Sequence, residues 1–193
     1  MKNEKTLMKV PVTYFEEKTT KNTDETLRLA YQRAKQLKIT HIVVPTTSGA
    51  TAVKALEIMN EVNLVVVTHM SGFKESGKNQ LLPEHRKILE ESNTPILTAS
   101  HALSGVERGI RNKFDTIGPA IVIASALKML GQGVKVGVEI TLMAADAGLI
   151  PMDQSIIALG GTNRGVDTAI VVQPAHTNNV FDLYIQELIC KPR

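Results

Sequence analysis

Short apolar runs alternate along this chain with segments whose apolar residues recur at helical spacing. The run at 64–68 is continuously apolar, as a strand covered on both faces must be. Residues 51–59, just before it, carry apolar side chains at helical spacing after an earlier run at 41–44. Strand, helix and strand in this order predict a wound sheet with helices on both faces. We therefore expect one α/β domain over residues 1–193, a three-layer α/β/α fold with a mostly parallel sheet.

The remaining elements follow from the same patterns and from the residues that begin and end them. Asn22 with Glu25, and Ser104 with Glu107, have the spacing of a capping box, which predicts a helix start. Residues 134–147 alternate like a strand, but their alanine-rich end before a glycine favours the helix that we choose. The expected strands are 10–15, 41–44, 64–68, 95–98, 155–159, 168–172 and 183–189; the expected helices are 22–37, 51–59, one opening at 83, 104–114, 120–130 and 134–147.

A hydroxyl-rich turn joins the run at 41–44 to the helical pattern that follows it. The free amides and the dipole of the first helical turn favour an anion there. Hydroxyl groups add hydrogen-bond donors, and a glycine lets the backbone come close to a ligand. A simple helix cap from Ser48 or Thr51 needs one hydroxyl, whereas this turn offers four. We interpret it as a phosphate cradle built from Thr46, Thr47, Ser48, Gly49, Ala50 and Thr51.

Other small and polar residues follow neighbouring strands, and in wound sheets ligands lie beyond the carboxyl ends of strands. A guanidinium at Arg164 can grip phosphate with two hydrogen bonds. Glu139, among apolar neighbours, is costly to bury, so it contacts a ligand, accepts a proton, pairs with an arginine or serves as a cap. Asp167 and Thr168 contact polar groups of the ligand or orient their loop. The expected site adds His69, Gly72, Ser104, Glu139, Met143, Gly161, Thr162, Arg164, Gly165, Asp167 and Thr168.

Composition excludes several other classes of function. Net charge is only +3, the cations are dispersed and aromatic residues make up 4% of the chain, which argues against nucleic acid. No stretch approaches 18 apolar residues and the first ten are charged, so we expect no membrane contact and a cytoplasmic protein. The five histidines lack metal-ligand spacing, which predicts no metal site. The sequence leaves open whether the chain forms homo-oligomers.

Two stretches resemble a known domain. The turn at 46–52 is similar to the phosphate-binding turn of the pyruvate kinase C-terminal domain, which holds an allosteric sugar phosphate there. Residues 144–151, followed by 156–161, resemble the helix end, strand and glycine-rich loop over that same ligand. This resemblance supports the helix at 134–147. Nothing in the chain resembles the catalytic barrel of pyruvate kinase, so the resemblance does not imply kinase activity.

The whole chain is identified as a member of a family of small stand-alone archaeal and bacterial proteins with this domain fold. Membership implies a flavin mononucleotide (FMN) cofactor, whose phosphate would lie on the turn at 46–51, but it implies no particular reaction. Ala50 departs from the family pattern, since relatives often have a second small or charged residue there. The matching pieces are residues 14–16, 22–27, 104–108, 138–146, 160–162, 167–169 and 174–179.

The expected function is therefore binding of a phosphorylated small molecule, FMN before others. A phosphate alone gives modest affinity, so a flatter part of the ligand must also be buried. Whether a flavin-dependent oxidoreductase reaction accompanies binding is left open. The alternative is a non-enzymatic sensor of a sugar phosphate or nucleotide, and a third, weaker one is a hydrolase or transferase. The candidate catalytic residues are Glu139, His69 and His176.

Overall fold

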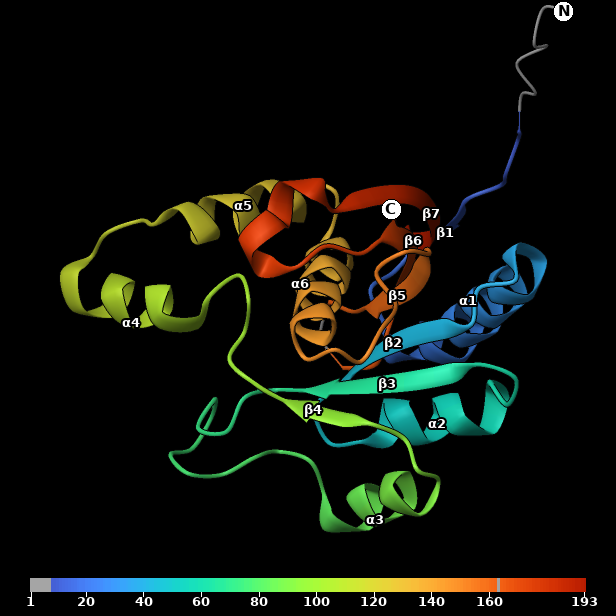
Figure 1. The fold of residues 1–193 in the computed structure, drawn as a ribbon, viewed down its shortest axis with the longest axis horizontal. Helices are drawn as coiled ribbons and strands as arrows, with labels where there is room; N and C mark the ends of the chain where they lie inside the picture. Colours follow the sequence, from blue (N-terminus) through green and yellow to red (C-terminus); the bar gives the residue numbers. More distant parts are fainter. Residues whose placement is uncertain (1–7, 163) are drawn as a thin grey trace, which may run out of the picture.

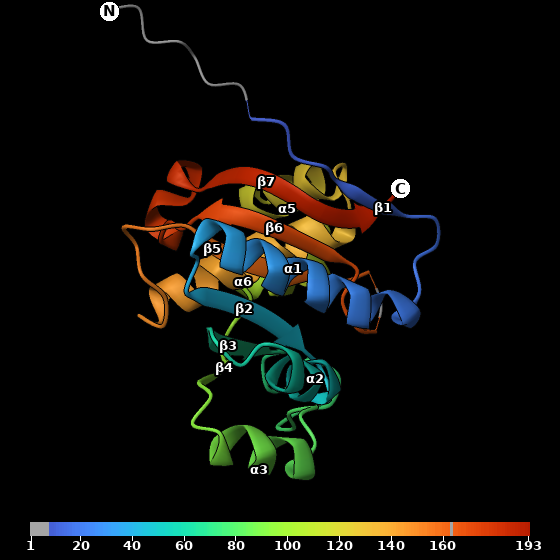
Figure 2. The ribbon, with the colours of Figure 1, turned by 90° about the vertical axis from the view of Figure 1, so that its right-hand side faces the viewer.

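The computed structural model describes residues 8–162 and 164–193, and these build a twisted sheet between two layers of helices (Figures 1 and 2). Seven strands of the described chain lie in the order β1-β7-β6-β5-β2-β3-β4, and β6 alone among them runs antiparallel to its neighbours. The expected mostly parallel sheet is confirmed. The strands are β1 (Thr13–Phe15), β2 (His41–Thr46), β3 (Asn63–Thr68), β4 (Ile96–Thr98), β5 (Ile156–Gly160), β6 (Thr168–Gln173) and β7 (Tyr184–Pro192).

Helices cover both faces of this sheet because its strands are apolar on both sides. Val65 and Val67 of β3 belong to one core with α6, whereas Leu64 belongs to the opposite core with α1. Figure 2 shows α1 and α2 on one face of the sheet and α5 and α6 on the other. The helices are α1 (Thr23–Leu37), α2 (Ala50–Ile58), α3 (Pro83–Glu91), α4 (Gly105–Phe114), α5 (Pro119–Lys128) and α6 (Gln132–Asp146), with 3₁₀ helices η1 (Thr20–Asn22) and η2 (Thr177–Asp182).

The order of strands reverses between β2 and β5. From β2 the chain moves outward to β3 and β4, and from β5 it moves outward to β6 and β7 in the other direction. A crevice is expected at the carboxyl ends of the strands on either side of such a reversal. The fold therefore points to the end of β2, where the turn at 46–51 begins.

Both predicted capping boxes are wrong, although the helices whose starts they predicted, α1 and α4, are present. The Asn22 side chain donates to the Glu17 carbonyl at 2.7 Å and does not cap α1. The Glu107 carboxylate accepts from the backbone N–H groups of Ala120 and Ile121, at 3.0 and 2.8 Å. Glu107 therefore caps α5 rather than its own helix. This is possible because the chain reverses direction between α4 and α5.

Most predicted boundaries lie within two residues of the observed ones. The helix chosen for 134–147 is confirmed as α6. The expected strand at 10–15 is shorter, because only Thr13–Phe15 pairs with β7. The strand expected at 41–44 continues through Pro45 to Thr46. Proline lacks an N–H, and it is tolerated here because β2 pairs with β5 only at Ile42 and Val43.

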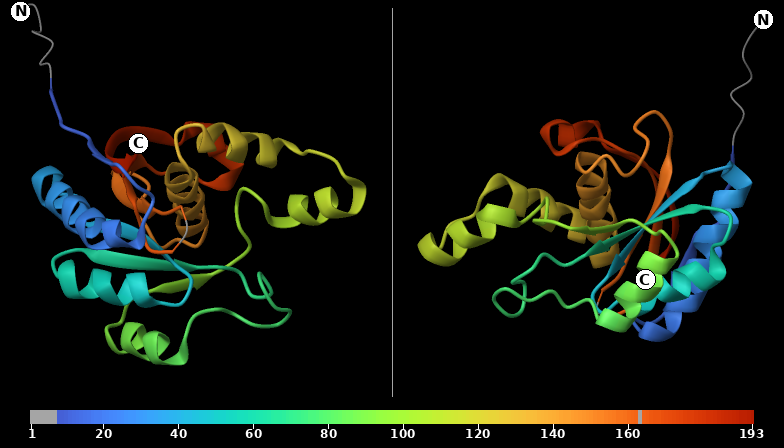
Figure 3. Two further views of the ribbon diagram at one scale, coloured as in Figure 1. Left: turned by 180° about the vertical axis from the view of Figure 1, so that it is seen from behind. Right: turned by 60° about the horizontal axis from the view of Figure 1, so that its bottom comes forward.

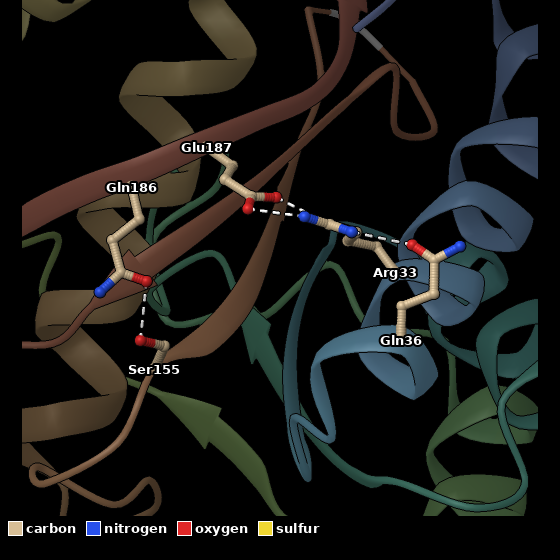
Figure 4. Close-up of polar contacts among 5 residues, drawn as sticks. All are labelled: Arg33, Gln36, Ser155, Gln186 and Glu187. Carbon is tan, nitrogen blue, oxygen red and sulfur yellow. Dashed lines mark hydrogen bonds and ion pairs between the residues drawn. The ribbon is translucent and has the colours of Figure 1, made fainter. Parts of the chain in front are cut away.

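An ion pair joins α1 to β7 across the layers (Figure 4). Arg33 donates from Nε and Nη2 to the two carboxylate oxygens of Glu187, at 2.8 and 2.7 Å, and both side chains are largely buried. A third donor, Nη1, reaches the amide oxygen of Gln36 at 2.9 Å. This two-pronged geometry fixes α1 over β7 and leaves the amino end of α1 facing the turn after β2.

Candidate functional site

The turn between β2 and α2 is held in one conformation by its own backbone contacts. The Gly49 N–H donates to Thr46 Oγ1 at 3.0 Å. The Ser48 carbonyl accepts from the Leu82 N–H at 3.1 Å and lies 2.8 Å from Nδ1 of His85. Gly49 has φ of 100°, a conformation that a side chain would strain. The turn is therefore rigid, and its backbone is fixed from the side of α3.

The first amides of α2 point out of this turn. The N–H groups at the start of a helix have no partner within the helix. No described side chain caps α2, so the alternative of a simple cap from Ser48 or Thr51 does not hold for the described residues. The hydroxyl of Thr46 accepts a hydrogen bond from the Gly49 N–H, before the first residue of α2. The amino end of α2 therefore presents donors and a positive dipole end to whatever lies in front of it.

A cleft of about 840 Å³ lies in front of this helix end. It is bounded by the ends of β2 and β3, the first turn of α2, one face of α6 and the loop after β5. Of the predicted site residues, it is lined by Thr46, Thr47, Ser48, Ala50, Thr51, His69, Glu139, Met143, Gly161, Thr162, Arg164 and Gly165. The structure thus brings together residues from four separate parts of the chain.

Five of the remaining predicted residues do not line the cleft. Gly49 lies within the turn itself, and Gly72 lies in the exposed part of the loop after β3. Ser104 is held at 3.4 Å by Nη2 of Arg108. Asp167 and Thr168 are buried behind the loop: Asp167 accepts from the Thr162 N–H at 3.1 Å and from the Thr168 hydroxyl at 2.8 Å. Asp167 and Thr168 therefore orient the loop, which was one of the two roles that the sequence left open.

The third catalytic candidate, His176, lies away from the cleft. Its Nδ1 is 3.2 Å from Oδ1 of Asp146, which also accepts from the Thr177 N–H at 3.0 Å. This contact fixes η2 against the carboxyl end of α6, whereas α6 borders the cleft from Gln132 to Met143. His176 is not among the residues that line the cleft.

A buried ion pair lines the wall that α6 contributes. Lys135 and Glu139 lie one helical turn apart, and the Lys135 ammonium donates to Oε2 of Glu139. The other carboxylate oxygen accepts from the Leu103 N–H at 3.1 Å. Among the readings that the sequence left open for Glu139, the described structure has a buried pair, with lysine rather than arginine. Because both side chains still border the cleft, they can also contact a ligand.

Two glycines bring α6 close enough to line the cleft. A Cβ atom at Gly160, the last residue of β5, would collide with the carbonyl group of Gly133 in the first turn of α6. A Cβ at Gly133 would collide with the Thr168 side chain. This close approach places Lys135 and Glu139 beside the end of β2, at the point where β2 and β5 no longer pair.

Sequence reasoning missed several of the lining residues. Thr20 and Thr23 enter from the amino end of α1, and Thr23 Oγ1 accepts from the Val166 N–H at 3.3 Å. Lys54 pairs with Asp24 at 2.6 Å between the two helix starts. A TxxT spacing before a helix was a usable signal for the threonines. The residues not predicted are Thr20, Thr23, Pro45, Lys54, Val67, Thr68, Gln80, Leu82, Gln132, Lys135, Val136 and Ile140.

Three rings gather at the outer end of the cleft. The ring of Phe73 lies 4.2 Å from that of His69 and 5.2 Å from that of His101, centroid to centroid. The guanidinium of Arg108 lies over Phe73 at 5.0 Å. His101 Nε2 accepts from the Met70 N–H at 3.3 Å, which requires that nitrogen to be unprotonated. The loop after β3 is thereby tied to the segment before α4.

Burial lowers the pKa of His101 below its usual 6.5; the nearby Glu139 carboxylate opposes this, and His69, Lys135 and Arg108 reinforce it. The unfolded chain therefore binds a proton more readily than the folded one. The stability contributed by neutral His101 is complete above pH 6.5 and is lost as the pH falls from there through the lower folded pKa.

We expect the urea midpoint of the protein to decrease as the pH is lowered from 7.5 to 5.5. The variant His101→Gln should show a weaker dependence of this midpoint on pH. Burial also lowers the pKa of His41, so His41→Gln is the matched variant. It should remove the separate contribution of His41 to the pH dependence of the urea midpoint. An unchanged pH profile in His101→Gln would contradict the assignment.

A second hollow, of about 710 Å³, lies at the opposite edge of the sheet. Its walls are residues 8–12, the end of α1 and the starts of β5 and β7, including Ser155 and Gln186, which bond to each other at 2.8 Å (Figure 4). It lies at the amino ends of the parallel strands and faces no described helix start. The cleft at α2 is therefore the better candidate for a ligand site.

Comparison with known proteins gives one family. The family model described as "Pyruvate kinase, alpha/beta domain" matches residues 24–172, well over half of the chain. Two crystal structures of pyruvate kinase from Cryptosporidium parvum are each 15% identical to the chain. The match to the first covers 80% of this chain and 22% of the kinase, with a TM-score of 0.41. The match to the second covers 82% of this chain and 24% of the kinase, with a TM-score of 0.43. The chain thus spans less than a quarter of the length of these structures.

Among residues 8–162 and 164–193, no helix has the length and apolar character to cross a membrane. Nor do the same residues bring together three histidine, cysteine or acidic side chains in an arrangement suited to a metal ion.

Proposed function

Because this chain belongs to the pyruvate kinase alpha/beta domain family, we propose that it binds a phosphorylated small molecule, FMN before others, in the cleft at the amino end of α2. The observation that carries the proposal is the turn at 46–51. Its backbone is fixed by Thr46, Leu82 and His85, yet no described side chain caps the helix that it opens. A helix end that is rigid and uncapped beside a cleft is suited to an anion.

The residues of the cleft fit the rest of FMN. Ligand pockets commonly measure about 300–1,000 Å³ and are mostly apolar with a few polar groups. Val67, Val136, Ile140 and Met143 supply an apolar wall, and the hydroxyls of threonines on the other side suit a ribityl chain. Lys54 and Arg164 line the same cleft and add positive charge near the phosphate.

In the bound state the flavin would supply hydride or one-electron transfer. The chain's own residues would hold the phosphate at α2, exclude water with the apolar wall and present the Lys135–Glu139 pair. The pair would then offer a donor and an acceptor close to the ligand. This leaves an oxidoreductase function as part of the proposal, with its substrate unspecified.

A second candidate is a sensor of a sugar phosphate or nucleotide without catalysis. The hydroxyl-rich lining favours it, since Thr20, Thr23, Thr47 and Thr68 offer many partners for sugar hydroxyls. It shares the phosphate contact with the first candidate and differs in needing no flat apolar ligand.

Thermal denaturation with paired ligands tests both candidates. Saturation at 100 times the dissociation constant stabilises a protein by about 2.7 kcal/mol, which for a chain of this size is a rise in Tm of roughly 5–10 °C. We expect that rise with FMN and a much smaller one with riboflavin, which lacks the phosphate. A sugar phosphate compared with its free sugar is the parallel test of the sensor. Equal effects of both members of a pair would contradict a phosphate site.

A further inference from the structure

Helix α4 projects from the body of the molecule without burying a side chain. None of its described residues, Gly105–Phe114, is buried. In Figures 1 and 3, α4 lies apart from the sheet, and the chain returns to the body of the molecule through α5. An isolated helix of ten residues is marginal in water, because helices in proteins depend on packing of an apolar face.

The sequence of α4 has the apolar face that such packing requires. Val106, Ile110 and Phe114 follow one another at intervals of four residues and so lie on one side of the helix. They are 80%, 43% and 69% exposed, and Ile117 just beyond is 72% exposed. A contiguous apolar surface of this kind on a monomer marks an interaction site.

A second exposed apolar surface lies nearer the body, on α5 and η2. Val122, Met129 and Leu130 are exposed on or just after α5, and Phe181 is exposed on η2. The inner sides of both elements pack into the same core. The molecule thus offers two separate apolar surfaces: the α4 face, and the outer face of α5 and η2.

Opposite charges flank the two surfaces, and Lys128 of α5 is an exposed cation beside the second one. Arg111 and Lys113 are exposed on α4. Asp182, at the end of η2, and Asp146, which accepts hydrogen bonds from Thr177 of η2, are exposed beside the second surface. The same acidic groups disfavour an anionic membrane as the partner of this region.

We propose that two copies of this chain form a twofold symmetric dimer in which α4 of each copy packs on the outer face of α5 and η2 of the other. A twofold axis lets one pair of complementary surfaces be used twice, so both apolar surfaces of both copies are covered. Arg111 and Lys113 then lie near Asp146 and Asp182 of the partner subunit. The proposal does not depend on the ligand of the cleft.

Light scattering of the 193-residue chain as it elutes from a size-exclusion column tests it directly. We expect twice the 21.0 kDa of the chain for the wild type. Ile110→Glu should raise the dimer dissociation constant about 100-fold or more, because it places an unpaired charge in the interface. The matched control is Ile88→Glu on α3, whose side chain is 42% exposed against 43% for Ile110 and which lies outside both surfaces. It should remain dimeric.

A charge exchange tests the pairing even if Ile110→Glu fails to fold. Arg111→Glu and Asp182→Arg should each weaken the dimer, and the double variant should restore it. A wild type of 21.0 kDa at every concentration overturns the proposal, as does a dimer that none of these variants weakens. A monomer that instead binds vesicles of anionic lipid overturns it in favour of a membrane surface.

Discussion

An aspartate at position 48 is expected to weaken binding of FMN at least about 100-fold, which corresponds to about 2.7 kcal/mol of binding free energy. The side chain of Ser48 borders the cleft at the start of α2, and a carboxylate there would stand close to the phosphate. Two like charges a few ångströms apart repel by about 1–4 kcal/mol, depending on the local dielectric. The carboxylate would also take the helix amides for itself, as an ordinary cap does.

Titration of flavin fluorescence measures this loss, and the urea midpoint of the ligand-free protein shows whether the fold is kept. Because a carboxylate at a helix start is stabilising, Ser48→Asp should not lower that midpoint. Ser48→Ala is the conservative variant and should lose about tenfold or less. Ser76→Asp, in the exposed loop after β3, adds the same charge away from the cleft and should bind normally. Normal binding by Ser48→Asp would move the phosphate away from this turn.

The layers of the fold were predictable because the signal for them is local. Each strand needs apolar side chains on both faces, and the run at 64–68 has them; the helix over 132–146 was recognisable from its alanine-rich end. The turn at 46–51 was predictable as a candidate site for a similar reason. Its hydroxyls, its glycine and the helix that follows are adjacent in sequence, so no distant contact had to be known.

The two predicted caps fail because a cap is chosen by geometry as well as by spacing. Glu107 has the correct interval from Ser104, but the chain reverses after α4 and brings the amino end of α5 to the carboxylate. The walls contributed by α1 and α6 were missed for a related reason. Lys135 has the sequence context of a surface lysine, and only the close approach of Gly133 to Gly160 turns it toward the cleft.

Removal of the Glu139 carboxylate is expected to be the most destabilising change to the ligand-free protein. Glu139→Ala leaves the Lys135 ammonium and the Leu103 N–H without their partner in a largely buried position. Breaking one side of a buried ion pair commonly costs about 3–5 kcal/mol. We expect about 3 kcal/mol in urea denaturation, at the low end because the cleft gives water a path to the ammonium.

The double variant Lys135→Met with Glu139→Leu separates the charge from the packing. Replacing a buried pair with apolar groups of similar size is often neutral, so most of the loss should be recovered, except for the part due to the Leu103 N–H. Lys135→Met alone completes the cycle and yields the coupling between the two side chains. If the two single changes simply add up in the double variant, the pair contributes no coupling energy. Lys135 and Glu139 would then be retained for what they contact in the cleft rather than for each other.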